Sequence, residues 1–61
     1  MKVSELIKVL KKNKCRLVRH GANHDLWYSP ITNMEFTVPR HRGKELPVKT
    51  ALSILKAAGL K

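Results

Sequence analysis

Two histidines close together in the sequence, His20 and His24, are the residues best placed to do chemistry. They flank the segment Gly-Ala-Asn (residues 21–23), in which glycine and asparagine favour a tight hairpin loop. A regular hairpin with this three-residue loop would place the two histidines opposite each other on one face of a sheet. Two opposed imidazoles could act as an acid and a base, or as two ligands of a metal. The common alternative for a strand histidine is a solvent-facing or hydrogen-bonded side chain without a catalytic role.

A metal site and a covalent nucleophile have less support. Zinc needs three or four ligands, and only Cys15, Asp25 and His41 remain to complete the set, at spacings that match no common zinc pattern. Cys15, at the start of a predicted strand, fits a small core residue better than a reactive thiol. Asp25 alternates with His24 and should point to the opposite face, which makes it a poor partner for a catalytic triad. The sequence therefore predicts neither a metal nor another cofactor.

The charge of the chain indicates an anionic partner. Lysine and arginine number 13 against 4 aspartate and glutamate, which gives a net charge of +9 over 61 residues. Unpaired cations on so small a surface repel one another, and RNA, DNA, an anionic membrane or an acidic protein would relieve that repulsion. The alternative is a basic domain that is merely soluble.

Cysteine content and hydropathy bear on the compartment. The single cysteine cannot form an internal disulfide, which favours a reducing cytoplasm. Charged residues interrupt the N-terminal segment before an apolar signal-peptide core can form, and no apolar run approaches the ~20 residues of a membrane span. A cytoplasmic protein that is neither secreted nor embedded in a membrane is therefore expected.

The residue pattern predicts a helix near each end of the chain. The first covers residues 4–13, with Ser4 as its N-cap and with Asn13 in the left-handed conformation that ends a helix. Its apolar residues recur at helical spacing: Val3, Leu6, Ile7 and Leu10. The second covers residues 47–58, with Pro47 in its first turn and Gly59 directly after its end. Its predicted buried stripe is Ala51, Leu52, Ile54, Leu55 and Ala58.

Three short strands are predicted between the helices, at residues 15–20, 24–28 and 34–38, and Pro39 ends the third. Alternation along the strands places Trp27 with Leu17 on one face and Tyr28 with His24 on the other, and Trp27 is expected in the core. The order α-β-β-β-α predicts an α+β fold over residues 1–61 as a single domain. Its three-stranded antiparallel sheet carries two helices on one face, as in the double-stranded-RNA-binding fold.

Six segments, spread over the whole chain, together resemble a known family: SELIKVLKK (residues 4–12), LVR (17–19), GANH (21–24), FTVP (36–39), KEL (44–46) and TALSILKAAGL (50–60). In this order they resemble the HicA family of bacterial toxins. The resemblance implies an mRNA interferase, the toxin of a type II toxin–antitoxin system, which cleaves mRNA, inhibits translation and is neutralised by a HicB-like antitoxin. Relatives often carry glycine and then a bulky aromatic residue where this chain has Lys14 and Cys15.

The resemblance also implies which residues act. The catalytic histidine of the family corresponds to His24, whereas His20 has no family role and stays a secondary acid or base candidate. RNA can be cleaved without a metal, because its 2′-OH attacks the adjacent phosphorus while an imidazole moves protons and a cation offsets the phosphorane charge. The candidate RNA contacts are Arg19, Tyr28, Arg40, Arg42 and Lys44.

Two other functions remain open at this point. The first is an RNA-binding module without catalysis. The second is a basic peripheral membrane protein whose first helix presents its lysines to anionic lipid, which is less favoured because the apolar residues of that helix are needed in the core.

Overall fold

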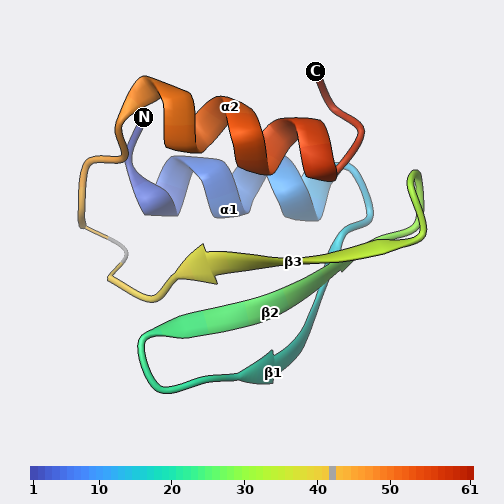
Figure 1. The fold of residues 1–61 in the computed structure, drawn as a ribbon, viewed down its shortest axis with the longest axis horizontal. Coiled ribbons are helices and arrows are strands. Elements are labelled where there is room, and N and C mark those ends of the chain that lie inside the picture. The colour runs from blue at the N-terminus through green and yellow to red at the C-terminus, as the bar shows by residue number, and fades with distance from the viewer. Residues whose placement is uncertain (42) are drawn as a thin grey trace.

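The computed structural model describes residues 1–41 and 43–61. The elements follow in the order α1 (Val3–Lys12), β1 (Arg16–His20), β2 (His24–Ser29), β3 (Met34–Pro39) and α2 (Val48–Ala57). The strands form an antiparallel sheet in the order β1-β2-β3, and both helices lie on the same side of it (Figure 1). The predicted α+β architecture is therefore confirmed, with element ends that differ by at most one residue.

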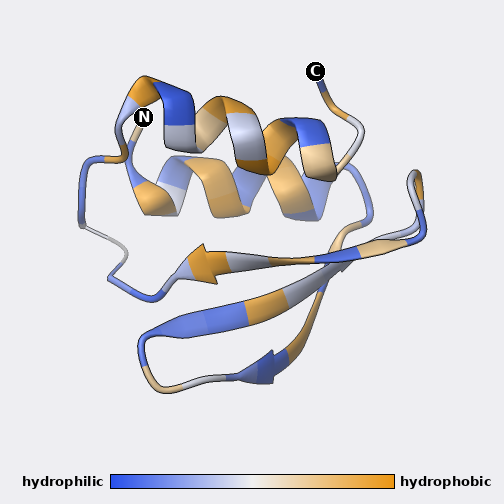
Figure 2. Ribbon diagram, in the orientation of Figure 1, coloured by the Kyte–Doolittle hydropathy of each residue, from blue (hydrophilic) through white to orange (hydrophobic). Residues whose placement is uncertain are grey.

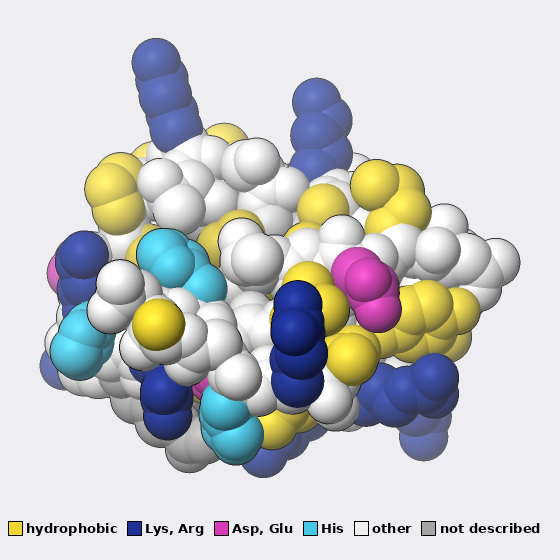
Figure 3. Space-filling model, turned by 60° about the horizontal axis from the view of Figure 1, so that its bottom comes forward, with side chains coloured by type: hydrophobic (Ala, Val, Ile, Leu, Met, Phe, Trp, Pro, Cys, Tyr) yellow, Lys and Arg dark blue, Asp and Glu magenta, His cyan; other side chains and the backbone are white. Residues whose placement is uncertain are grey.

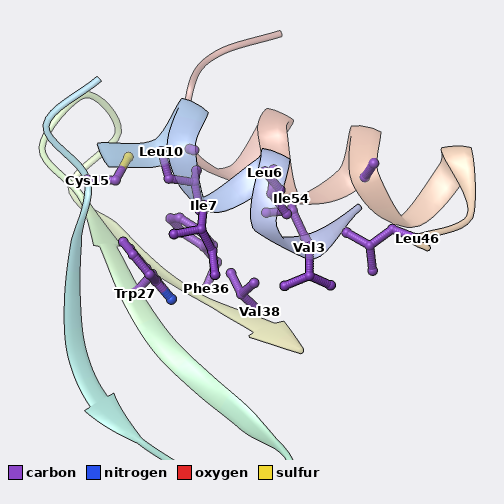
Figure 4. Close-up of a cluster of buried hydrophobic side chains, with 12 residues drawn as sticks. Val3, Leu6, Ile7, Leu10, Cys15, Trp27, Phe36, Val38, Leu46 and Ile54 are labelled. Atoms are coloured by element: carbon purple, nitrogen blue, oxygen red, sulfur yellow. The ribbon is translucent and has the colours of Figure 1, made fainter. Parts of the chain in front are cut away.

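The core lies between the helices and the sheet. Figure 4 shows Ile7 of α1 pointing toward the sheet, where Trp27 and Phe36 lie. Hydrophobic residues are concentrated in this layer, whereas the hairpin end of β1 and β2 is hydrophilic (Figure 2). The buried cluster comprises Val3, Leu6, Ile7, Leu10, Cys15, Trp27, Phe36, Val38, Leu46, Ala51, Ile54 and Ala58. The predicted apolar stripe of α1 and the core positions of Cys15 and Trp27 are confirmed.

The apolar stripe of α2 is narrower than predicted. Ala51, Ile54 and Ala58 are buried and Leu55 is half-buried, but Leu52 is 40% exposed. The prediction for Leu52 was wrong, because the helix contacts the rest of the protein through a single row of residues three and four apart.

The start of α1 is set by a distant part of the chain. Lys2, not Ser4, is the N-cap; its N–H donates to the Glu5 carboxylate at 2.8 Å. The Val3 N–H donates to the carbonyl of Lys44 at 3.0 Å. The predicted N-cap was therefore wrong, because α1 begins before Ser4, with the amides of Lys2 and Val3 bonded to Glu5 and Lys44.

The end of α1 also differs from the prediction. Asn13 has a φ of −100°, and the following Lys14 takes the left-handed conformation with a φ of 71°. The Lys14 N–H donates to the carbonyl of Lys11 at 3.1 Å, and the Cys15 N–H donates to that of Leu10 at 2.9 Å. These two bonds form a Schellman motif. Pro47 was predicted to lie in the first turn of the second helix. It is the N-cap of α2 instead, one residue before that turn.

Two hydroxyl groups of the β2–β3 region hold the C-terminal end of α2. Ser29 is fully buried, and its Oγ donates to the carbonyl of Ala58 at 2.7 Å. The same Oγ accepts the N–H of Ile31 at 3.2 Å. Thr32 Oγ1 donates to the carbonyl of Ala57 at 2.8 Å. The turn after β2 thereby satisfies carbonyl groups that the helix itself leaves unpaired.

The register of the β1–β2 hairpin differs by one residue from the prediction. The Gly21 N–H donates to the carbonyl of His24 at 2.9 Å, and His20 pairs with Asp25. His20 and His24 therefore do not lie opposite each other, and that prediction was wrong. A Cβ on Gly21 would lie 2.3 Å from the His24 carbonyl oxygen, so only glycine fits the turn.

The register of β1 shifts once more at its centre. Leu17 pairs with Trp27 and Arg19 pairs with Leu26, so Val18 is the extra residue of a bulge. Arg16 pairs with Tyr28. The bulge therefore brings both arginines of β1 to the face that carries Tyr28.

Candidate functional site

His24 lies where the uncovered sheet face meets the second helix. It is the first residue of β2 and pairs with Pro39 at the end of β3. Since the alternating Trp27 and Ser29 are buried under the helices, His24 and Tyr28 belong to the opposite face, as predicted. The His24 side chain is exposed and lines an open groove of about 540 Å³ that runs along β3 and α2.

The groove combines an apolar surface with polar groups. Phe36, Ile54 and Ala57 supply apolar contacts, and the polar groups are an imidazole, an ammonium group and three hydroxyls. The full lining is His24, Phe36, Thr37, Pro39, Lys49, Thr50, Ser53, Ile54 and Ala57. Such a surface can hold an anion beside a group that moves protons.

Lys49 is a groove residue that the sequence prediction did not name. It lies in the first turn of α2, which contains no acidic residue. The positive end of the helix dipole adds to the lysine charge there, and both favour a phosphate over a cation. The sequence feature that could have indicated Lys49 was the first turn of the second predicted helix, which contains lysine and threonine but no acidic residue.

A second polar cluster surrounds the hairpin loop on the other side of β2. His20 Nδ1 lies 2.9 Å from Asp25 Oδ1, and the same oxygen lies 3.4 Å from Arg40 Nε. Arg40 Nη1 donates to the carbonyl of Gly21 at 2.8 Å. His20 is therefore engaged with Asp25, on the face opposite to His24, and does not line the groove.

The other predicted RNA contacts are spread over the molecule. Tyr28 lies on the His24 face, with the Arg16 guanidinium 4.7 Å from its ring centroid and its hydroxyl donating to Asn33 Oδ1 at 2.7 Å. Arg19 is exposed on the same face. Lys44 is exposed beside the start of α1, away from the groove lining. Arg42 lies outside the described residues.

Figure 3 shows histidine side chains toward one end of the surface below the helices, among lysine and arginine side chains. Within residues 1–41 and 43–61, no three His, Cys, Asp or Glu side chains come together as a metal site would require. In the same residues, neither helix combines the length and the apolar character needed to cross a membrane.

Comparison with known proteins gives the family. A search of curated proteins found no significant match to the chain. A family model described as the HicA toxin of bacterial toxin–antitoxin systems matches residues 3–60, nearly the whole sequence. The match spans α1, the sheet, the hairpin with His24 and the groove formed by α2. The chain belongs to the HicA family of toxins of bacterial toxin–antitoxin systems, which implies a cognate antitoxin as its partner.

Proposed function

We propose that this toxin is a metal-independent endoribonuclease that cleaves mRNA and thereby inhibits translation. The observation that carries the proposal is that His24 and Lys49 line one open groove. The imidazole can move protons near neutral pH, and the ammonium group can contact a phosphate. Membership of the HicA toxin family supports the same activity.

The reaction needs groups that the groove and the RNA supply, together with water. The ribose 2′-OH attacks the adjacent phosphorus and loses its proton, and the bond from phosphorus to the 5′-oxygen breaks as that oxygen gains one. His24 takes the proton from the 2′-OH or gives one to the leaving 5′-oxygen, and water serves the other transfer. Lys49 and the first turn of α2 offset the negative charge that develops on the phosphorane oxygens. The products are a 2′,3′-cyclic phosphate and a 5′-OH end.

The partner is a HicB-like antitoxin in the cytoplasm. A net charge of +9 favours an acidic surface on that partner. The same basic surface is proposed to bind RNA at the groove. The antitoxin should therefore cover the groove and compete with the transcript.

The test is cleavage of a labelled transcript in the presence of excess EDTA. We expect the wild-type protein to cleave it and to leave a 2′,3′-cyclic phosphate, and His24→Ala to lose about 10²–10⁴ in rate while remaining folded. His41→Ala is the matched control, because it removes an exposed imidazole that lies outside the groove. Full activity of His24→Ala would remove the assignment. A transcript that is bound but not cleaved would favour a non-catalytic RNA-binding module.

A further inference from the structure

We propose that Arg40 is a positioning residue that holds the β1–β2 hairpin loop and so places His24 in the groove. The inference rests on the proposed function, and it changes the role of Arg40 from a predicted RNA contact to an internal support.

Arg40 binds both sides of the loop and the strand that follows it. Its Nη1 donates to the Gly21 carbonyl at 2.8 Å, on the β1 side of the loop. Its backbone N–H donates to the Asn23 carbonyl at 3.3 Å, on the β2 side. Its Nε lies 3.4 Å from Asp25 Oδ1. One residue at the end of β3 thus contacts three residues of the hairpin.

The residues that Arg40 contacts also restrain the backbone of His24. The Gly21 N–H donates to the His24 carbonyl at 2.9 Å, so the residue whose carbonyl Arg40 binds also holds the backbone of His24. Asp25, which follows His24 along β2, is bound by the Arg40 guanidinium, and its side chain is only 16% exposed. Both neighbours of His24 in the sequence, Asn23 and Asp25, are therefore bound to Arg40.

Besides Arg40, His20 also holds the base of the loop, through its Nδ1 at 2.9 Å from Asp25 Oδ1. Residues 20–24 are all exposed, so apolar packing contributes little to its position. A displacement of a catalytic group by about 1 Å can cost about 10²-fold in rate. A loop that carries the catalytic histidine on polar contacts alone is therefore sensitive to the loss of one of them.

The guanidinium is needed for its shape as well as its charge. Its planar group presents Nε and Nη1 to the Asp25 carboxylate and the Gly21 carbonyl at the same time, which a single ammonium group cannot reproduce. A phosphate contact on a flexible surface, by contrast, tolerates lysine as a point charge. Arg40→Lys therefore separates the two roles.

The experiment compares Arg40→Lys and Arg40→Gln with the charge control Lys12→Gln, an exposed residue of α1 outside the groove. Transcript cleavage gives kcat and KM, at a temperature where every variant is shown to be folded. We expect both Arg40 variants to lose at least tenfold in kcat with KM changed less than threefold, and Lys12→Gln to behave as wild type. Binding of the same transcript is measured in the inactive His24→Ala background, where Arg40→Lys should change the affinity less than threefold.

Hydrogen exchange of the Gly21 and Arg40 amides provides a readout without activity. Both amides should exchange faster in Arg40→Lys than in the wild type, while amides in the middle of β2 keep their protection. Full activity and unchanged exchange in Arg40→Lys would overturn the proposal, and so would a loss confined to RNA affinity. If the wild type itself cleaves no transcript, the proposed function fails, and the exchange result still decides whether Arg40 holds the loop.

Discussion

Lys14 and Gly59 occupy the same place at the ends of the two helices. Each follows the C-cap residue and has a positive φ, 71° for Lys14 and 81° for Gly59. The hydrogen bonds match as well: the Gly59 N–H donates to the carbonyl of Lys56 at 3.0 Å, and the Leu60 N–H donates to that of Leu55 at 2.8 Å. Glycine adopts this conformation at no steric cost, whereas lysine does not.

We expect Lys14→Gly to stabilise the toxin. A left-handed residue with a Cβ costs about 1–2 kcal/mol, and the greater freedom of glycine in the unfolded chain offsets about 0.5–1 kcal/mol of that gain. The net increase in the free energy of unfolding should be about 0.5–1 kcal/mol, measured by urea denaturation. The control is Gly59→Ala, whose Cβ would lie 2.7 Å from Ile31 Cγ2. It should destabilise the protein, and a stability loss in Lys14→Gly would contradict the assigned backbone strain.

Ser29→Ala should lower the free energy of unfolding by about 1–3 kcal/mol, because it leaves a carbonyl of α2 without its buried donor. The measurement is thermal or urea unfolding. Ser4→Ala serves as the comparison, since Ser4 is not the N-cap of α1, and it should change stability by no more than about 0.5 kcal/mol. Equal effects of the two substitutions would contradict the role given to the Ser29 hydroxyl.

Lys49→Gln should lower the rate of transcript cleavage by at least about tenfold. Removal of a preorganised oxyanion donor costs about 10²–10³-fold, and solvent screening of the exposed Lys49 reduces that figure. Lys8→Gln removes the same charge from the exposed face of α1 and should leave the rate unchanged. If both variants lose activity equally, net charge rather than the groove explains the effect.

Salt should weaken the binding of RNA and of the antitoxin alike. Each phosphate contact on single-stranded RNA should contribute about −0.7 to the slope of log affinity against log salt. Titration of a labelled transcript bound to His24→Ala measures that slope and avoids cleavage. Addition of the antitoxin should displace the transcript, and a ternary complex of toxin, RNA and antitoxin would contradict a shared surface.

The amino-acid sequence by itself determined the features whose signals are local. The helical spacing of Leu6, Ile7 and Leu10 identified the buried face of α1, and Gly59 marked the end of α2. Strand alternation placed Trp27 in the core and His24 on the opposite face. Each of these signals depends on residues within a few positions of one another, where the periods of helix and strand dictate which side chains share a face.

Only the tertiary structure decided the features that depend on distant partners. The pairing of Val3 with Lys44 lies at the start of α1, before the predicted cap Ser4, and Ser29 bonds to α2 across the turn. A hairpin register that differs by one residue moved His20 away from His24, because a single-residue shift in register reverses every side chain of a strand. The groove that joins His24 to Lys49 exists because α2 packs along β3, and no local pattern encodes which residues of two separate elements will meet there.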